Sequence, residues 1–477
     1  MASMPGCTIR QVSKDLGIGE RWRIWLGYRC RDTTRSAFRL RSPFLGYVPR
    51  LSKIHLTYNV HVLNIQQLLH AVSSRPGPNM QHTQVLIIGA GPVGTVAAIC
   101  LCRHGVDVIL LEALPTWAKD LRGSTFHPPT LEMLAKLGVA DAIIAQGLRS
   151  PVYQYRERQS PDVFAFDLGE LSDMTEFPYR LQCEQYKLTR HLCESLAVEP
   201  GARLLFSHRA THFEQDSQGI TVYADTPTAR TSFRAEYVIA ADGANSIIRR
   251  LANIEFEGFT YPEKFVTLST RYPLEKHFTG LANVNYIADP DTWVLLLRTP
   301  DVWRVLVPAA ENQSDTYLRS DEFKDLVFAG LTGIPNGIRT EHRTIYPVHQ
   351  RVARTYRAQR VLLTGDAAHL NNPLGGFGLN TGIHDAWNVA GKLVSILENG
   401  AADALLDLYD RQRRTVTRNF IQTQSIRNKE MMEQSGEQGL RQRRTELQRI
   451  YNDQKLRRNY MMDQALFTSL ADADNIS

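Results

Sequence analysis

The sequence has few cysteines, and their arrangement is not one that holds a metal ion. It contains 6 in 477 residues, and they lack the CxxC pairs that are typical of structural zinc sites. Cys100 and Cys102 lie two positions apart, so they would face different sides of a helix. Scattered thiols of this kind indicate a reducing compartment. We therefore predict reduced cysteines, no metal site and a cytoplasmic location.

Long apolar runs are also missing. No stretch approaches the roughly 20 apolar residues that a membrane-spanning helix needs, and no secretory signal pattern stands at the start. The hydrophobic fraction of 43% and the charged fraction of 22% are those of a globular protein. The sequence therefore predicts no membrane span, and its length suits two or three domains.

Most of the chain also lacks an excess of either charge. Residues 1–79 contain 12 lysines and arginines and 3 acidic residues, so their net charge is +9. The whole chain has a net charge of +6, so the remaining residues carry −3. A body with this balance offers no general basic field for nucleic acid. We therefore expect no nucleic-acid partner.

Residues 1–79 are rich in arginine and precede the first recognisable motif. We predict an N-terminal extension that is unstructured or not part of the fold, and translation from Met80 would omit it. Two alternatives stay open. One is a mitochondrial transit peptide, which has this composition, and the other is a small binding region.

The first motif is a glycine-rich turn after an apolar run. Val85–Ile88 predict a buried parallel strand. Gly89, Gly91 and Gly94 follow at the spacing of a dinucleotide-binding turn. There the first glycine permits the tight turn, the second lets the backbone approach a pyrophosphate, and the third lets the next helix pack closely. The motif by itself does not separate FAD from NAD.

The next helix and strand complete a nucleotide-binding unit. A helix is predicted from Pro92 to His104. Proline is tolerated at the start of a helix, because the backbone amide there has no hydrogen-bond partner within the helix. The amides at the helix start favour a phosphate. A second strand, Asp107–Leu111, ends at Glu112. That carboxylate suits a ribose hydroxyl and argues against a 2′-phosphate.

Two further apolar strands each end in an aspartate beside a glycine. These pairs are Asp242-Gly243 after Tyr237–Ala241 and Gly365-Asp366 after Arg360–Thr364. The carboxyl edge of a parallel sheet is where ligands of such folds bind. We therefore expect both aspartates to lie beside the glycine-rich turn.

A second glycine-rich segment precedes a long helix that is predicted to reach about residue 399. The segment contains Pro373, Gly376, Gly378, Leu379 and Asn380. Its glycines would let a ligand lie close to the backbone, and the amides of a helix start stabilise an anion. This segment therefore suits a ligand that carries negative charge.

In this order and at this spacing, the motifs resemble the class A flavoprotein monooxygenases, which include p-hydroxybenzoate hydroxylase and phenol hydroxylase. The resemblance covers roughly residues 82–425. It implies FAD as the cofactor, NADPH or NADH and O₂ as co-substrates, and hydroxylation of a small aromatic, phenolic substrate through a flavin C4a-hydroperoxide. A small phenol, a phenolic acid and a polyketide aromatic would all be compatible. A homodimer is common among such proteins.

The resemblance also assigns roles to individual residues. Asp366 would bind the ribityl chain, while Asp242 and Gly243 would support the pyrophosphate and NAD(P)H docking. Arg122 matches an arginine near the FAD phosphates, and Gln185 matches a glutamine that lines the FAD site. Pro373 would shape the catalytic site beside the ring. The sequence does not name a catalytic base.

The implied fold is α/β, with a Rossmann-like FAD-binding domain, an inserted antiparallel β-sheet substrate domain and C-terminal helices. The FAD-binding domain would be discontinuous, over residues 80–150, 183–255 and 343–400. The substrate domain would span 151–182 and 256–342, and the C-terminal helical region 401–477. Within that region we expect helices over 402–423 and 438–470.

Alternating apolar residues predict the strands of the substrate domain. The expected strands are Val266–Tyr272, Trp293–Arg298 and Val302–Val307. Candidates for contact with the substrate are Arg271, Tyr286, Trp293 and Arg298. Plain sheet packing or a solvated strand face is the alternative for each of them.

Rival functions on the same scaffold stay open at this point. A flavin halogenase would carry a WxWxIP segment, and the stretch from Asp301 to Pro308 does not match it. An epoxidising or ring-modifying flavin monooxygenase of a secondary-metabolite pathway is compatible with the motifs. A non-catalytic protein on this fold, similar to the GDP-dissociation inhibitors, would not need Glu112, Arg122 and Asp366.

Overall fold

The computed structural model describes residues 80–477 apart from 120, 122, 159, 290–291 and 435. All of these residues belong to one compact unit, Arg75–Ser477. The predictions for residues 1–79 and for Arg122 lie outside the described residues. Among the described residues, no helix combines the length and the apolar character that a membrane crossing requires.

The first sheet has a parallel centre, as the motifs predict. Its strands lie in the order β17–β18–β11–β1–β2–β8, and β9 and β10 extend β11 as an antiparallel pair. The central pairs of this path, from β18 to β8, are parallel. The bounds are β1 Gln81–Ile88, β2 Val108–Leu111, β8 Ala202–Leu205, β9 Arg209–Asp216, β10 Gly219–Asp225, β11 Arg230–Ala240, β17 Arg357–Ala358 and β18 Val361–Leu363.

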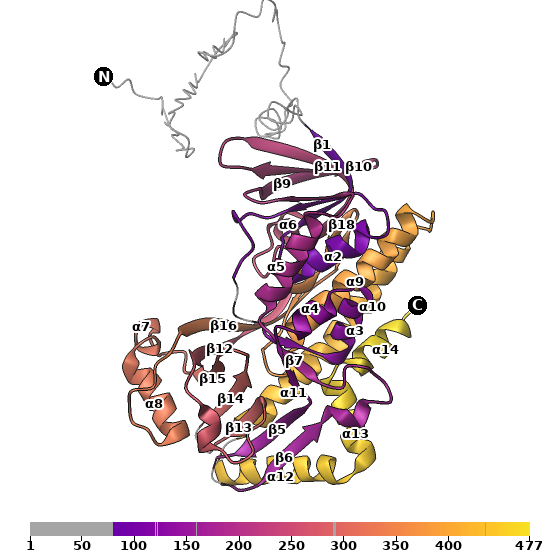
Figure 1. The fold of residues 1–477 in the computed structure, drawn as a ribbon. Helices are drawn as coiled ribbons and strands as arrows, with labels where there is room; N and C mark the ends of the chain where they lie inside the picture. The colour runs from indigo at the N-terminus through magenta and orange to yellow at the C-terminus, as the bar shows by residue number, and fades with distance from the viewer. Residues whose placement is uncertain (1–79, 120, 122, 159, 290–291, 435) are drawn as a thin grey trace, which may run out of the picture. The chain divides into compact units, whose positions relative to one another are not determined.

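Helices pack against this sheet through their apolar sides. Helix α2 (Pro92–Cys102) contacts both α5 (Gln185–Leu196) and α9 (Phe377–Leu397), and the three lie side by side in Figure 1. The strand residues Val85–Ile88 are buried beneath them, which explains why this run is continuously apolar. The shorter helices nearby are α3 Pro128–Lys136, α4 Ala140–Ile144 and α6 Ile247–Leu251.

The second sheet is mainly antiparallel. Its order is β19–β16–β12–β15–β14–β13–β5–β6, and within it the pair β13 and β5 is parallel. The bounds are β5 Val152–Glu157, β6 Val163–Asp167, β12 Phe256–Thr270, β13 Val284–Ala288, β14 Trp293–Arg298, β15 Trp303–Ala309, β16 His342–Ala353 and β19 His369–Leu370. The short elements that flank it are η1 Leu168–Leu171, η2 Leu274–His277, α7 Asp315–Leu318 and α8 Asp321–Thr332.

The position of β16 differs from the predicted domain ranges. Apart from His342, its residues fall within the range 343–400 that the sequence assigned to the FAD-binding domain, yet β16 pairs with β12 in the second sheet. A register shift between Thr260 and Lys264 interrupts this pairing, and such irregularities bend a ribbon of strands. The two strands therefore form one bent ribbon at this edge of the second sheet.

A small third sheet lies close to the predicted cofactor site. It contains β3 (Thr125–Phe126), β7 (Arg180–Gln182) and β4 (Leu148–Ser150) in the order β3–β7–β4. All three residues of β7 are fully or almost fully buried. The sequence analysis did not predict this sheet, because strands of two or three residues show no periodicity.

The C-terminal region is helical, but its helix boundaries differ from the prediction. The prediction of one helix over 438–470 is wrong: α12 ends at Asn452, and Asp453 caps α13 by accepting from Lys455 N and Leu456 N. The first predicted helix, over 402–423, contains a π-helical turn, η4, and continues beyond 423 as α11. The bounds are α10 Leu405–Val416, η4 Thr417–Ile421, α11 Gln422–Glu433, α12 Gly436–Asn452, α13 Gln454–Gln464 and α14 Phe467–Asp474.

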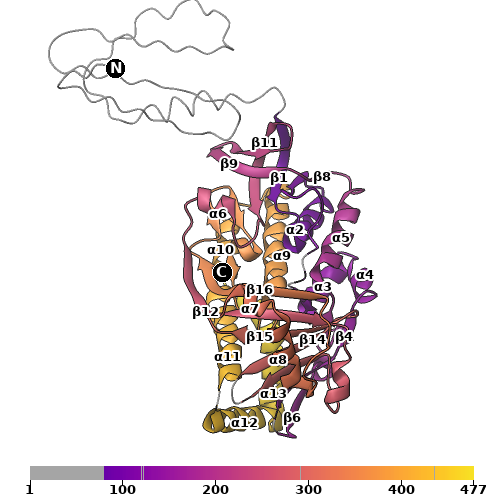
Figure 2. The same ribbon diagram turned by 90° about the vertical axis from the view of Figure 1, so that its left-hand side faces the viewer.

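Helix α12 contacts the far edge of the second sheet (Figure 2). Arg444 forms an ion pair with Glu157 of β5, and Tyr451 packs edge-on against Phe164 of β6 at 5.9 Å between ring centroids. Helix α12 therefore covers the end of the second sheet formed by β5 and β6.

Gly94 offers a test of the close packing between α2 and β1. A Cβ atom at Gly94 would lie 2.0 Å from the carbonyl oxygen of Gly89, which is backbone and cannot turn aside. We predict that Gly94→Ala lowers the free energy of unfolding by about 1–3 kcal/mol, as overpacking does. Urea unfolding of the FAD-free protein measures this change.

Gly391→Ala is the matched control, since a Cβ atom at Gly391 within α9 meets nothing within 4 Å. It should leave stability equal or raise it by up to about 1 kcal/mol. Equal unfolding curves for the two variants would contradict the packing argument.

Candidate functional site

The carboxyl ends of β1, β2, β11 and β18 border a cavity of about 790 Å³, called here the large cavity. Many of the predicted cofactor residues line it. These are Gly89, Gly91, Pro92, Glu112, Gln185, Asp242, Gly243, Asp366, Gly378 and Leu379. The structure therefore brings the three distant motifs together at one edge of the first sheet.

The glycine-rich turn has the geometry that a pyrophosphate needs. Gly89 has φ of +103°, and a Cβ atom there would lie 2.4 Å from the carbonyl oxygen of Ala241. A Cβ atom at Gly91 would meet nothing within 4 Å, so this position leaves room for a ligand at the start of α2. The first turn of α2 contains no acidic residue, and its free amides favour an anion.

The carboxylate of Glu112 is fixed by two backbone amides. Its Oε2 accepts from Ala90 N at 2.9 Å, and its Oε1 accepts from Leu114 N at 2.9 Å. Glu112 therefore stands at the end of β2 in a defined orientation beside the glycine-rich turn. This is the position at which the fold accepts a ribose hydroxyl.

Asp242 is buried beside the same turn. Its Oδ2 accepts from Ile247 N at 2.8 Å and Ile248 N at 3.2 Å, whereas Oδ1 has no hydrogen-bond partner among the described residues. Burial raises the pKa of this carboxyl above its ordinary value. An unpartnered carboxylate oxygen in the wall of the cavity fits a ligand that donates a hydrogen bond.

Arg249 links the second and third motifs, a role that the sequence analysis did not predict. Its guanidinium donates to Ala244 O at 2.9 Å and to Ala367 O at 2.8 Å, and it lies over the ring of Phe256 at 3.8 Å. The turn after β11 is thereby tied to the turn that carries Asp366. The signal for this role in the sequence was an arginine three residues after a serine that can cap a helix, and Ser246 does accept from Arg249 N.

A second cavity, of about 200 Å³, adjoins the first and is called here the small cavity. Gln185, Asp366, Gly378 and Leu379 line both cavities. The other walls come from the segment that leads into α9, from the second sheet and from β3 of the third sheet. They include Thr125, Thr267, Leu295, Leu297, Arg304, Leu306, Tyr346, Pro373 and Phe377. An outer cavity of about 460 Å³ shares Thr267, Arg304 and Tyr346 with it.

The start of α9 is held in place by Asn380. Its amide donates to Thr125 O at 2.9 Å and Gly376 O at 2.7 Å, and its oxygen accepts from His127 N at 2.8 Å. Asn380 is fully buried, so it positions the helix start and does not line either cavity. Gly376 adopts φ of +71°, which places the amides of the following turn beside the small cavity.

Gly94 and Gly365 also act through packing. A Cβ atom at Gly365 would lie 3.0 Å from the side chain of Val93, and its φ is +57°. Neither glycine lines a cavity, so each lets the backbone around the cofactor site approach closely.

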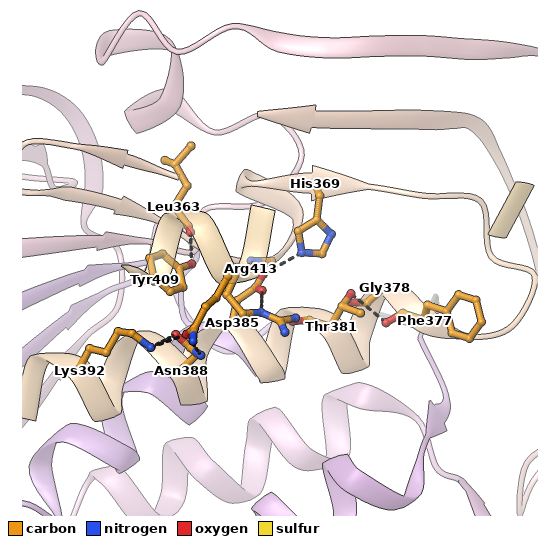
Figure 3. Close-up of polar contacts among 12 residues, drawn as sticks. Leu363, His369, Phe377, Gly378, Thr381, Asp385, Asn388, Lys392, Tyr409 and Arg413 are labelled. Carbon is orange, nitrogen blue, oxygen red and sulfur yellow. Dashed lines mark hydrogen bonds and ion pairs between the residues drawn. The ribbon is translucent and has the colours of Figure 1, made fainter. Parts of the chain in front are cut away.

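A buried ionic network supports the turn that carries Asp366 (Figure 3). Asp385 of α9 pairs with Arg413 of α10 at 2.7 Å and contacts His369 Nε2 at 2.7 Å. Its Oδ2 also accepts from the backbone amide of Gly365 at 3.1 Å. All three side chains are at most 1% exposed. The turn is therefore held to α9 by the buried carboxylate of Asp385.

The charge of Asp385 is maintained by its partners. Burial would raise the pKa of this carboxyl, but His369 and Arg413 outweigh that effect and hold the pKa below its ordinary value. The sequence analysis did not predict this network. The positions of His369 and Asp385 gave no signal, because their contact depends on how the turn packs on α9.

The four predicted substrate residues do not line the large, small or outer cavity. Arg271 is exposed and lies 3.5 Å from Glu341. Tyr286 is buried and stacks on Tyr155 at 4.9 Å. The other two lie on β14: Trp293 packs edge-on against Phe265 at 5.2 Å, and Arg298 lies over the ring of Trp303 at 5.6 Å. The linings of the small and outer cavities do not include any of these four residues.

The residues that do line the small cavity come from neighbouring strands at matched positions. Thr267 of β12 pairs with Leu306 of β15, which pairs with Leu295 of β14. These three side chains form one row across a single face of the sheet. The alternating pattern predicted the strands but not which face covers the cofactor site.

The comparisons with known proteins agree with this geometry. Residues 82–424 match the protein family described as FAD binding domain. The para-nitrophenol 4-monooxygenase of Pseudomonas sp. (strain WBC-3) is 32% identical over 356 residues, which are 74% of this chain and 87% of that protein. The 6-hydroxy-3-succinoylpyridine 3-monooxygenase of Pseudomonas putida is 31% identical, over 72% of this chain and 86% of that protein.

Solved structures show the same fold. The crystal structure of p-nitrophenol 4-monooxygenase from Pseudomonas putida superposes with a TM-score of 0.77 at 29% identity, and the match covers 82% of this chain and 99% of that one. The anhydrotetracycline hydroxylase of Streptomyces rimosus superposes with a TM-score of 0.69 at 25% identity, over 81% of this chain and 76% of that one.

Asp366 tests the assignment of the large cavity. We predict that Asp366→Ala loses most of its bound FAD, because its carboxylate lies where both cavities meet and would accept hydrogen bonds from a ribityl chain. Flavin absorbance per purified protein measures occupancy. Asp225→Ala, at the exposed end of β10, should retain FAD. Equal occupancy in the two variants would refute the role of Asp366.

Asp385 tests the buried network. We predict that Asp385→Asn lowers the free energy of unfolding by about 3–5 kcal/mol, since Arg413 would keep a buried, uncompensated charge. Asp216→Asn removes an exposed partner of Arg234 and should lose much less.

The pH dependence of this contribution has a defined sign. Because the folded-state pKa of Asp385 is lowered, its contribution is complete above the unfolded pKa of about 3.9 and is lost as pH falls through the folded pKa. Unfolding curves for wild type and Asp385→Asn should therefore converge only in strong acid. A constant difference down to the lowest accessible pH would contradict this account.

Proposed function

We propose that this chain, which belongs to the FAD-binding domain family of the class A flavoprotein monooxygenases, hydroxylates a small phenol with a single ring. The chain is an FAD-dependent oxidoreductase that hydroxylates an aromatic substrate, as the family match and the related monooxygenases show. The size class of the substrate and its phenolic nature are the proposal.

The observation that carries the proposal is the size of the small cavity. Its volume of about 200 Å³ lies below the roughly 300–1,000 Å³ of pockets that hold drug-sized ligands. The cavity adjoins the start of α9, where the amides favour the negative charge of a reduced flavin ring. A single aromatic ring fits this space better than a polycyclic one.

The residues around the small cavity have complementary roles. Leu295, Leu297 and Leu306 give it an apolar wall, which packs a ring and excludes water. Bound FAD supplies the redox and oxygen chemistry of hydroxylation. Pro373, Gly376 and Gly378 also line the cavity and would fix the plane of the substrate ring.

The relatives support the same substrate class. The chain covers most of a protein named para-nitrophenol 4-monooxygenase. The name of that protein indicates a substrate with a single ring. The rival of a non-catalytic protein is not favoured, because Glu112, Asp242 and Asp366 all stand in the wall of the large cavity.

Three further properties stay predictions from the sequence. They are homodimerisation, a cytoplasmic location without nucleic-acid binding, and the use of either NADPH or NADH. The Arg-rich extension over residues 1–79 leaves a mitochondrial location as the alternative.

A substrate panel tests the proposal. We expect the FAD-loaded protein to oxidise NAD(P)H faster, by about tenfold or more, in the presence of a single-ring phenol, with hydroxylated product formed in proportion. Product and hydrogen peroxide are measured together, because peroxide reports uncoupled turnover. Polycyclic phenols serve as the control and should not stimulate. Stimulation by polycyclic phenols alone would overturn the assignment to a single ring.

A further inference from the structure

Several buried polar atoms next to the small cavity have no hydrogen-bond partner among the described residues. They are Nδ1 of His127, Nε2 of Gln182, and both Nε and Nη2 of Arg180. The three side chains are at most 1% exposed. An unpaired buried polar atom costs about 1–3 kcal/mol, so a group of them at one place indicates a ligand.

The small third sheet explains why these atoms lie together. Thr125 of β3 pairs with Gln182 of β7, and Phe126 pairs with Leu181. The next step of the same register places His127 opposite Arg180. Because side chains alternate along a strand, Thr125, Gln182, His127 and Arg180 share one face of this sheet.

That face is turned toward the small cavity. Thr125 lines the cavity, and its hydroxyl donates to Gln182 Oε1 at 3.1 Å. The ring of His127 lies 6.0 Å from that of Phe377, which also lines the cavity. The unpaired atoms therefore lie directly behind the cavity wall.

Arg180 approaches the same wall from the second sheet. Its guanidinium lies 4.1 Å from the centre of the Tyr153 ring, and its Nη1 donates to Tyr286 Oη at 3.4 Å. Tyr286 pairs with Leu295, a residue of the cavity wall. The groups that act on the charge of Arg180 are these tyrosines and Tyr155. A buried guanidinium among neutral hydroxyls is suited to an oxygen that carries negative charge.

His127 supplies a hydrogen-bond acceptor, whereas Arg180 supplies donors. Its Nε2 lies 2.8 Å from the carbonyl oxygen of Gly375, and a carbonyl only accepts, so Nε2 carries the proton. Nδ1 is then a hydrogen-bond acceptor. Burial and the charge of Arg180 lower the pKa of His127 well below its ordinary value, which keeps Nδ1 unprotonated at neutral pH.

We propose that His127, Arg180 and Gln182 form a polar subsite that binds the phenolic hydroxyl of the substrate, a proposal that rests on the function proposed above. A hydroxyl has one donor and two acceptor positions. The proton would be donated to Nδ1 of His127, while Arg180 and Gln182 donate to the oxygen. Arg180 also favours negative charge on that oxygen, which makes the ring richer in electrons for hydroxylation.

Side chains of the cavity wall lie next to the residues of the subsite. Thr125, Leu295 and Phe377 line the cavity and neighbour Gln182, Tyr286 and His127, respectively. Side-chain rotamers at binding sites commonly change when a ligand binds, so we expect the hydroxyl to reach the subsite by rotamer changes in this wall.

The test compares two ligands that differ only in the hydroxyl. The FAD-loaded, full-length protein is titrated with 4-nitrophenol and with 4-nitrotoluene, in which a methyl group replaces the hydroxyl, and binding is followed through flavin absorbance or fluorescence. We expect Arg180→Met to weaken binding of 4-nitrophenol by about tenfold or more, since hydrogen bonds to charged groups contribute about 1.5–3 kcal/mol. Binding of 4-nitrotoluene should stay within about twofold of wild type.

Arg149→Met is the matched control. Arg149 lies on β4 of the same small sheet opposite Leu181, and its exposed side chain lies over Tyr179 at 5.2 Å. This variant should keep wild-type affinity for both ligands. If Arg180→Met does not fold, Gln182→Glu replaces it, because a carboxylate there would pair with Arg180 and should weaken 4-nitrophenol binding by a similar factor.

The outcomes separate this proposal from the proposed function. Equal weakening of both ligands, or no weakening of 4-nitrophenol, overturns the hydroxyl subsite. If wild type still hydroxylates single-ring phenols in that case, only the subsite fails. If wild type hydroxylates none of them and does not prefer 4-nitrophenol to 4-nitrotoluene, both proposals fail.

Discussion

The ion pair between Asp385 and Arg413 is the contact on which the rest of the site depends. It joins α9 to α10 between side chains that are at most 1% exposed, and the same carboxylate contacts His369 and the amide of Gly365. Helix α9 also provides the glycine-rich start that borders both cavities. The turn with Asp366 and the start of α9 are therefore fixed relative to each other by one buried charge, which is costly to expose and costly to leave unpaired.

The parts that were predictable from the sequence rest on local backbone requirements. The turn at Gly89 needs a positive φ and a close approach to Ala241 that only glycine supplies, and the missing side chain of Gly91 leaves room for a ligand at the start of α2. The acidic residues that end parallel strands must meet at one sheet edge, so Asp242 and Asp366 were placed correctly beside that turn. These features repeat wherever the same backbone is built, and a single sequence is enough to find them.

The parts that were not predictable depend on packing between distant segments. Leu295 and Trp293 lie two positions apart on the same face of β14, so alternation does not tell which of them borders the small cavity. That is set by how the second sheet docks on the rest of the fold. The contact between Thr125 and Gln182 joins residues far apart in sequence through strands too short to show a pattern. The break at Asp453 had a visible signal, a capping aspartate, but helix-forming residues on both sides obscured it.

The wall of the small cavity has a consequence for how this enzyme could acquire new substrates. Leu295, Leu297, Arg304 and Leu306 are strand side chains at alternate positions, whereas the large cavity is bordered by the turns that follow β1, β11 and β18. A substitution at one of these alternate positions changes the shape of the wall without disturbing the ladder of hydrogen bonds beneath it. Selection can therefore alter substrate choice one residue at a time while the oxidising centre stays constant.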